Sequence, residues 1–314
     1  TLRLARELFP VTSISVETNP NHLTDNHIAV LKQANVNRLS VGIQTFNDDL
    51  LKTIARYDKY GSGEEIAARL RKTMGSFDTL NADMIFNFPG QTKEMLEADL
   101  AVLLKINMQQ VTFYPLMVST LTQRLMQETL GEVNFSHEKY LFKLILRRLE
   151  ADYESSSAWC FSRKKAAKSM IDEYVVDFDE YAGLGSGAIG YLNGVCYANT
   201  FDIAQYIAGL EKGNLPLQAA RRFDVPDQMR YDFLMKLFST HLNVNELEKK
   251  YAGRFFKTLW KETAAFTLAG SFRYFTPNLY LTPFGRYYWV IMMREFFIAV
   301  NNFRDFCRKQ AGLG

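Results

Sequence analysis

Four polar residues stand at places in this sequence where they could hold one small ligand. Glu17 closes the strand-like run SISVE, Gln44 follows RLSVGI, and Asp83 heads the apolar run MIF. Arg56 lies in the helix-like segment that follows the second of these runs. A guanidinium pairs with a carboxylate, a carboxylate pairs with an ammonium or two ribose hydroxyls, and an amide both donates and accepts. An amino-acid nucleoside would use all four side chains.

Each of these residues also has an ordinary structural interpretation. Glu17, which precedes Thr-Asn-Pro, can cap the next turn, and Gln44, close to the small Gly42, can be a structural hydrogen-bonding residue. Arg56 can pair with Asp58 on the surface, a bond that contributes little to stability. A series of polar residues at successive strand ends is less expected by accident than any single one, so the set favours a binding site.

The elements that would position these residues alternate between β-rich and helical patterns. Four predicted strands cover residues 13–18, 38–46, 78–89 and 109–116, and helical patterns lie between them. This alternation predicts βαβ units with parallel strands and right-handed crossovers. The fold class expected is therefore α/β, with part of a parallel barrel whose chemistry gathers at the carboxyl ends of the strands.

Beyond residue 120 the pattern becomes mostly helical. We expect helices over residues 136–151, 202–212, 225–240, 244–251 and 252–269, then a hairpin over 272–283 and a long final helix. The Gly-Asn-Leu-Pro run before residue 217 resembles a boundary. It predicts one domain over 1–216 and a small, mostly helical accessory domain with a β-wing over 217–314. The aromatic residues of the final helix, such as Trp289, are most simply core.

Three further features have both a functional and a structural interpretation. The glycines of GLGSGAIGYLNG (183–194) allow the backbone to approach a flat ligand or a neighbouring strand. The basic residues within 163–168 could bind acidic groups of a substrate, such as propionates, or form a solvated loop. The histidines show no metal-ligand spacing, although one could ligate a haem iron axially; they are His22, His27, His137 and His241.

Composition limits the class of protein. The chain has 314 residues, 47% of them apolar, which is enough for one large core or two domains. Its net charge of +3 gives no reason to expect nucleic acid or an anionic membrane as a partner. No run reaches the roughly 18 apolar residues of a membrane span. The three cysteines are far apart, so they suit neither a disulfide framework nor a metal cluster and indicate a reduced, cytoplasmic setting.

Several motifs, in this order and spacing, resemble one family. They are SVETNP, RLSVGIQTFND, NADMIFNFPGQT, QQVTFYPL and AGLGSGAIGYLNG. Over nearly the whole chain the sequence resembles the oxygen-independent coproporphyrinogen III oxidase-like radical SAM proteins. Two strings, MIDEYVVDFDEYAGLGSGAIGYLNG and YWVIMMREFFIAVNNFR, are more similar to the haem-utilisation branch (HutW/ChuW type) than to the oxidase itself.

The resemblance implies a radical SAM (β/α)6 half-barrel, of which this sequence would hold about four of the six strands. S-adenosylmethionine (SAM) would bind at the strand ends and chelate a [4Fe–4S] cluster. By motif, Glu17 and Arg56 would hold the methionine amino and carboxylate groups. Gln44 and Asp83 would hold the ribose hydroxyls.

Three more positions follow from the same resemblance. Tyr114 and Pro115, at the last strand end, would lie near the adenine, and Ile189 would line a second nucleoside or substrate pocket. Asn87 departs from the family pattern, which usually has glycine there, and narrows the room around the ligand. The CxxxCxxC cluster motif and the glycine-rich SAM-binding turn belong to a segment upstream of these strands. The sequence starts at Thr1 without them, so we expect that upstream sequence is missing and that this chain alone is inactive.

The implied function is haem chemistry. The leading expectation is SAM-dependent radical methylation and ring opening of haem under anaerobic conditions, with iron release. Haem would be the substrate, and a flavodoxin or a flavin reductase would supply electrons. The alternatives are oxidative decarboxylation of coproporphyrinogen III and a haem-binding chaperone. The motifs identify no catalytic residue.

Overall fold

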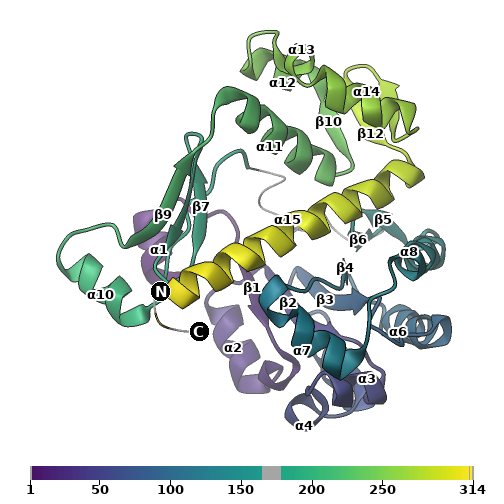
Figure 1. The fold of residues 1–314 in the computed structure, drawn as a ribbon. Coiled ribbons are helices and arrows are strands. Elements are labelled where there is room, and N and C mark those ends of the chain that lie inside the picture. Colours follow the sequence, from purple (N-terminus) through teal and green to yellow (C-terminus); the bar gives the residue numbers. More distant parts are fainter. Residues whose placement is uncertain (1, 165–177, 311, 313–314) are drawn as a thin grey trace. The chain divides into compact units, whose positions relative to one another are not determined.

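The computed structural model describes residues 2–164, 178–310 and 312 (Figure 1). The contacts between residues divide the chain into two compact units. The first unit comprises residues 1–116 and 125–172, and the second comprises residues 117–124 and 173–314. The predicted domain boundary after residue 216 lies inside the second unit and stays a prediction.

The first unit is built on a six-stranded sheet in the order β1-β2-β3-β4-β6-β5. Its strands are β1 Ser15–Thr18, β2 Arg38–Gln44, β3 Thr79–Phe86, β4 Gln110–Pro115, β5 Tyr153–Ser155 and β6 Cys160–Arg163. The first four are parallel to one another, and β6 and β5 add an antiparallel edge. The four predicted strands and their parallel pairing are thus confirmed. The antiparallel pair carries no pattern that predicts it, because each strand is too short to show alternation.

Helices connect the parallel strands along the chain, and others precede β1 or follow β4 (Figure 1). They are α1 Leu2–Leu8, the 3₁₀ helix η1 Pro20–His22, α2 Asp25–Gln33, α3 Asp48–Thr53, α4 Tyr57–Tyr60, α5 Gly63–Thr73, α6 Lys93–Ile106, α7 Thr120–Leu130 and α8 Phe135–Leu149. Neither α1 nor α7 was expected. Helix α3 does not continue into α4, because Ala55 between them adopts a left-handed φ of 55° that a helix cannot continue.

The two faces of the sheet differ in polarity. Successive residues of a strand point to opposite faces. Leu39, Leu80 and Val111 are fully buried on one face. Helix α8 packs there, where Phe142 stacks on Phe86 with ring centroids 6.1 Å apart. The opposite face carries polar residues, among them Ser40 and Asp83. Parallel sheets usually carry apolar residues on both faces, so these polar residues indicate that a polar group is held against this face.

The second unit contains two three-stranded antiparallel sheets, β7-β8-β9 and β10-β12-β11. Its elements are β7 Ile189–Leu192, β8 Val195–Asn199, α10 Ile203–Glu211, β9 Leu217–Arg222, α11 Val225–Phe238, β10 His241–Asn243, α12 Val244–Lys250, α13 Phe255–Thr258, α14 Trp260–Leu268, β11 Phe272–Phe275, β12 Asn278–Leu281 and α15 Pro283–Gln310. The predicted hairpin is confirmed as β11 and β12, with β10 as an unexpected third strand. The helix predicted over 252–269 is interrupted by the non-helical Leu259, whose side chain is fully buried.

An aromatic cluster around Trp289 forms much of the core of the second unit. Trp289 is fully buried on α15, and its indole N–H donates to the Leu234 carbonyl at 2.9 Å. Phe233, Phe266 and Phe272 surround it, with ring centroids 5.7, 5.0 and 5.8 Å away. The prediction that Trp289 belongs to the core is confirmed.

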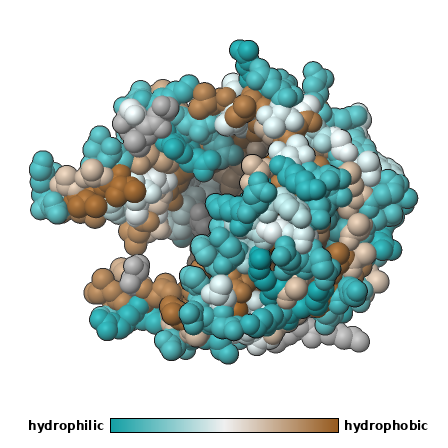
Figure 2. Space-filling view, turned by 90° about the horizontal axis from the view of Figure 1, so that it is seen from below, coloured by the Kyte–Doolittle hydropathy of each residue, from teal (hydrophilic) through white to brown (hydrophobic). Residues whose placement is uncertain are grey.

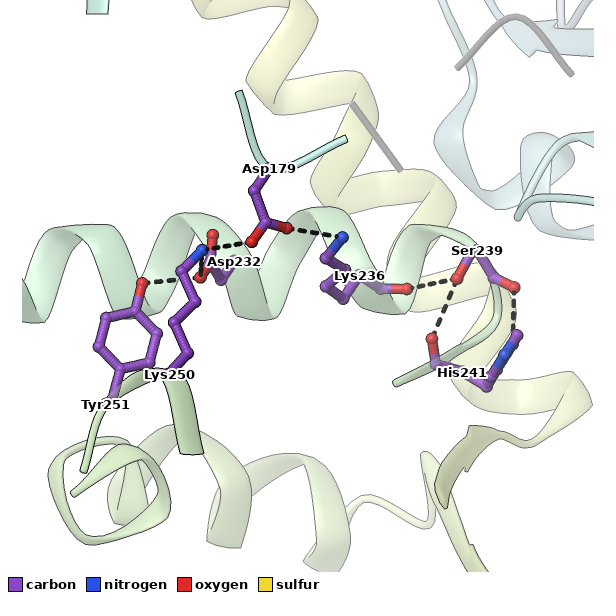
Figure 3. A network of polar contacts seen from close by, with 7 residues as sticks. All are labelled: Asp179, Asp232, Lys236, Ser239, His241, Lys250 and Tyr251. Carbon is purple, nitrogen blue, oxygen red and sulfur yellow. Dashed lines mark hydrogen bonds and ion pairs between the residues drawn. The ribbon is translucent and has the colours of Figure 1, made fainter. Parts of the chain in front are cut away.

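A polar network fixes the segment before β7 to helices α11 and α12 (Figure 3). Asp179 bonds to Nζ of Lys236 at 2.9 Å and to Nζ of Lys250 at 2.8 Å. Lys250 also reaches the buried Asp232 at 2.7 Å, and the Tyr251 hydroxyl donates to the same carboxylate at 2.7 Å. Burial alone would raise the pKa of Asp179, but the two lysines outweigh it and lower that pKa. The network therefore balances two carboxylates, the exposed Asp179 and the buried Asp232, with lysines from two helices.

The surface is mixed in polarity. Figure 2 shows hydrophobic patches separated by hydrophilic side chains. Helix α10 contributes exposed apolar residues, among them Ile203 and Ile207. Of the helices in the described ranges, none has the length and apolar character needed to cross a membrane.

Candidate functional site

The polar face of the first sheet begins with a row of buried hydrogen-bonding side chains near the amino ends of the strands. Arg38 Nε donates to Oε1 of Gln110 at 2.8 Å, and its Nη1 donates to Oγ of Ser15 at 3.1 Å. Gln110 Nε2 then donates to Oγ of Ser162 at 3.0 Å. Both Arg38 and Gln110 are buried. Buried polar groups must be hydrogen-bonded to be tolerated. These bonds therefore hold the side chains of the row in fixed positions on the polar face of the sheet.

Asp83 stands on the same face, nearer the carboxyl ends of the strands. Its Oδ2 accepts from Oγ of Ser40 at 2.6 Å, and its Oδ1 accepts from Nδ2 of Asn81 at 2.8 Å. Thr112 Oγ1 donates to Oδ1 of Asn81 at 3.1 Å and so fixes that amide. Asp83 itself is only partly buried. Each carboxylate oxygen can accept a further bond, so Asp83 is held in one orientation and can still accept from a ligand.

Gly42 lies beside Asp83 in the next strand and marks a bend in β2. The register between β2 and β3 shifts between Gly42 and Gln44, and Gln44 has a left-handed φ of 75°. An ideal Cβ on Gly42 would lie 3.2 Å from Nε2 of Gln44 and 3.8 Å from Nη2 of Arg56. The bulge thus turns Gln44 back over Gly42. We name Gly42, Gln44 and Arg56 the strand-end corner.

Arg56 reaches the strand-end corner from the start of α4. Its Nη2 donates to the Gly42 carbonyl at 2.6 Å, and its guanidinium lies over the Tyr60 ring, 4.4 Å from the centroid. Partial burial lowers the pKa of Arg56, and Tyr60 opposes that shift. An arginine remains cationic at neutral pH. Arg56 Nε is buried without a hydrogen-bond partner among the described residues. The predicted surface pair with Asp58 is not the contact that orders this side chain.

Three of the other predicted residues lie at neighbouring strand ends. Glu17 is exposed in β1, and its strand register places it beside Ser40, the residue that donates to Asp83. In β4, Tyr114 packs edge-on against Trp159 with ring centroids 5.2 Å apart, and Pro115 is buried. The sheet therefore brings Gln44, Arg56 and Asp83 together, with Glu17 one strand away.

Ile189 belongs to the second unit and stands in a tightly packed turn-strand segment. An ideal Cβ on Gly183 would lie 2.5 Å from the Ile189 carbonyl oxygen, and one on Gly190 would lie 2.3 Å from the Tyr197 ring. These glycines therefore permit close contact within the chain. The structural interpretation of the glycine-rich segment accounts for both positions.

Asn87 occupies the position where the family motif has glycine. Its φ is 68°, a left-handed conformation that asparagine tolerates better than most residues. Its backbone N–H donates to Oε1 of Gln91 at 2.7 Å, which closes the turn before α6. The backbone geometry thus explains why glycine also suits this place.

The described residues do not fit an iron–sulfur cluster. Within residues 2–164, 178–310 and 312, no three His, Cys, Asp or Glu side chains come together as a metal site. Cys160 lies in β6, Cys196 in β8 and Cys307 in α15.

The basic cluster predicted over residues 163–168 lies only partly within the described residues, because residues 165–168 lie outside them. Lys164 Nζ donates to the Glu150 carbonyl at 2.6 Å.

The strand ends do fit the polar groups of SAM. The unused donor at Arg56 Nε suits a carboxylate. The fixed Asp83 carboxylate suits hydroxyl donors, and the amide of Gln44 can both donate and accept. When bound, SAM supplies the carboxylate, ammonium, ribose hydroxyls and reactive sulfonium that such a site would orient.

Motif analysis missed the residues that hold this site in place. They are Ser15, Arg38, Ser40, Asn81, Gln110, Thr112 and Ser162. A usable signal was present, because polar residues recur at every second position of three strands. Such alternation is unusual for parallel strands.

Comparison with known proteins agrees with this fold. Residues 1–103 match the family model described as the Radical SAM superfamily. The chain is 27% identical to the heme chaperone HemW of Bacillus subtilis over 266 residues, which are 82% of this chain and 67% of that protein. It is 30% identical to HemW of Lactococcus lactis over 208 residues, 64% of this chain and 53% of that protein.

An oxidase and a solved structure are similar as well. The oxygen-independent coproporphyrinogen III oxidase of Helicobacter pylori (strain 26695) is 25% identical over 268 residues, 79% of this chain and 58% of that protein. The structure of the Escherichia coli coproporphyrinogen III oxidase HemN superposes with a TM-score of 0.73 at 20% identity, over 93% of this chain and 72% of that one.

The chain spans from 53% to 67% of the length of the three sequence relatives. These relatives are heme chaperones and an oxidase, so the finer resemblance to the haem-utilisation branch stays a prediction. The fold is that of the HemN radical SAM domain followed by small sheets and helices. By sequence and by fold, this chain is similar to the HemW and HemN proteins, and its residues 1–103 match the radical SAM superfamily.

Proposed function

We propose that this chain carries the SAM-binding strand ends of a radical SAM protein that binds haem as a chaperone. The carrying observation is the strand-end corner beside Asp83, where a guanidinium with an unused donor, an amide and an oriented carboxylate meet. The HemW relatives supply the haem part of the proposal. The setting would be the reducing cytoplasm.

In this proposal each strand-end residue has one task. Arg56 pairs with the methionine carboxylate and Glu17 with the methionine ammonium. Gln44 and Asp83 hold the ribose hydroxyls. The adenine lies near Tyr114 and its neighbour Pro115, and Ile189 lines a second pocket. The [4Fe–4S] ligands are not among the described residues, so no step is assigned to a cluster here.

A second candidate is haem degradation. It is favoured by the two strings that resemble the haem-utilisation branch, within residues 170–194 and 288–304. The reaction would be SAM-dependent radical methylation and ring opening of haem with iron release. An electron donor such as a flavodoxin or a flavin reductase would then be required.

Haem spectroscopy separates these candidates. The full-length protein, with its [4Fe–4S] cluster reconstituted, would be mixed with haem without oxygen, and SAM and a reductant would then be added. A stable Soret band with saturable binding supports the chaperone, whereas loss of the band with release of iron supports degradation. When coproporphyrinogen III is supplied in place of haem, its conversion to the divinyl product would support the oxidase. Absence of any haem interaction would contradict the first two.

The SAM site has a separate test. Asp83→Asn keeps the shape of the side chain but removes its charge, so SAM affinity measured by calorimetry should fall about tenfold or more. Asp49→Asn is a matched control, because Asp49 is an exposed residue of α3 that pairs with Lys52 on the surface. Equal SAM affinity of wild type and Asp83→Asn would refute the ribose role.

A further inference from the structure

Helix α6 carries a buried carboxylate that the proposed SAM contacts do not use. Asp99 is 1% exposed. Its Oδ2 accepts from Oγ1 of Thr45 at 2.9 Å, and its Oδ1 accepts from the Phe46 amide at 2.7 Å. Thr45 and Phe46 directly follow Gln44, so this carboxylate ties α6 to the loop that leaves the strand-end corner.

Both partners of Asp99 are neutral. Among the described residues no cation pairs with it. Helices α5 and α8 pack against α6, and neither contributes a charged group to the environment of the carboxyl. Burial raises the pKa of Asp99 to about 7, against the two hydrogen bonds, which lower it. Charged carboxylates are seldom buried without a charged partner. Burying the Asp99 carboxyl here costs free energy that an apolar residue filling the same space would not cost.

The loop that Asp99 holds is conformationally demanding. Gln44 has a φ of 75°, and a non-glycine residue keeps such a conformation only when its surroundings impose it. Thr45 is fully buried, and its Oγ1 also accepts from the Asn47 amide at 3.0 Å. Asn47 in turn caps α3 through Leu50. One carboxylate therefore fixes both the exit from β2 and the start of α3.

We propose that Asp99 is a positioning residue: its carboxylate holds Thr45 and Phe46 and so keeps the Gln44 amide over Gly42, where it can meet the ligand. The inference rests on the proposed function, in which the strand-end corner binds SAM. The ionised carboxylate accepts stronger bonds than its protonated form. The corner is therefore most ordered above neutral pH and looser in acid.

The test compares Asp99→Asn with Glu97→Gln. Glu97 lies on the same helix and pairs with Lys93 at 3.7 Å, away from the loop, so its variant removes one charge and leaves the loop untouched. SAM affinity would be measured by calorimetry at pH 6 and pH 8.5. Since the ligand ammonium titrates too, the readout is the ratio of dissociation constants, variant over wild type, at each pH.

For Asp99→Asn we expect a ratio of about 10 at pH 8.5, falling towards 1 at pH 6, where wild-type Asp99 is itself protonated. For Glu97→Gln the ratio should stay near 1 throughout. Thr45→Val, which removes one donor and keeps the carboxylate, should weaken SAM binding less than Asp99→Asn. A ratio for Asp99→Asn that is the same at both pH values would overturn the inference.

Amide hydrogen exchange gives an independent readout. At pH 8.5 the amides of residues 44–47 should exchange faster in Asp99→Asn than in Glu97→Gln. Equal protection in the two variants would overturn the positioning role even if no form of the protein bound SAM. Failure of every form to bind SAM, with the exchange difference present, would instead refute the proposed function and leave the hold of Asp99 on the loop established.

Discussion

Gly42 sets the geometry of the candidate site by having no side chain. The Gln44 amide and the Arg56 guanidinium both occupy the space beside its Cα, and Arg56 also takes its carbonyl. A methyl group there would approach Gln44 Nε2 to 3.2 Å, closer than most real contacts of a Cβ atom. The positions of the Gln44 and Arg56 side chains thus depend on the lack of a Cβ atom at residue 42.

Gly42→Ala should therefore weaken SAM binding by about 1 kcal/mol, or about fivefold, because Gln44 must move aside. Calorimetric titration with SAM measures this change. Gly209→Ala is a matched control, since its Cβ would lie 3.1 Å from Cβ of Pro216, a similar crowding in α10. If the two variants bind SAM equally well, Gly42 does not shape the site.

Residue types predicted part of this arrangement. Gln44, Arg56 and Asp83 could be chosen because each polar type stands at or after a strand end. The bulge that turns Gln44 over Gly42 could not, because a register shift depends on how two strands pair. Asp99 was missed because a single acidic residue in a helical pattern ordinarily indicates an exposed face.

Among the elements, the turn between β3 and α6 shows how the backbone restricts residue choice. Asn87 begins this turn with a φ of 68° and is 2% exposed. Its Nδ2 and the Nε2 of Gln91 are buried without hydrogen-bond partners in the described part of the chain. The turn therefore combines a strained conformation with two unsatisfied donors, each of which costs free energy.

Asn87→Gly should relieve both costs at that residue, whereas Asn87→Ala should relieve only the unpaired amide and keep the cost of holding a Cβ in the left-handed conformation. We expect the alanine variant to be less stable than the glycine variant by about 1 kcal/mol in the free energy of unfolding. Urea denaturation of the two proteins measures the difference. A more stable alanine variant would contradict the backbone explanation of this position.

Elements with strong periodicity were predictable, and their interruptions were not. The four parallel strands show clear β-rich runs, and α6 begins at a recognisable cap, Thr92, which accepts from Met95. The breaks at Ala55 and Leu259 depend on local backbone angles and on burial of a single side chain. The short strands β5, β6 and β10 form only because a neighbouring strand offers its edge.

At the scale of the whole molecule, Asp99 makes stability depend on pH. A carboxyl whose pKa is raised on folding binds its proton more tightly in the folded than in the unfolded state. Its contribution to the free energy of unfolding therefore falls as the pH rises from 3.8 to about 7 and is constant above that range.

Wild type and Asp99→Asn should accordingly diverge with pH. Relative to the variant, wild type should lose stability between pH 5 and about pH 7, with no further change at higher pH. Chemical denaturation followed by circular dichroism at several pH values measures the difference. A constant difference in free energy across this range would show that Asp99 does not change its pKa on folding.

The placement of the tryptophans has a practical consequence. Trp159 is buried beside Tyr114 in the first unit, Trp289 is buried in the core of the second, and Trp260 is 61% exposed. The chain holds three tryptophans in all, so each reports on a different environment. With Trp260 replaced by phenylalanine, the remaining tryptophan fluorescence would come from one buried residue in each unit, Trp159 in the first and Trp289 in the second. Emission from Trp159 would then follow occupation of the strand ends, and emission from Trp289 would follow the melting of the second unit.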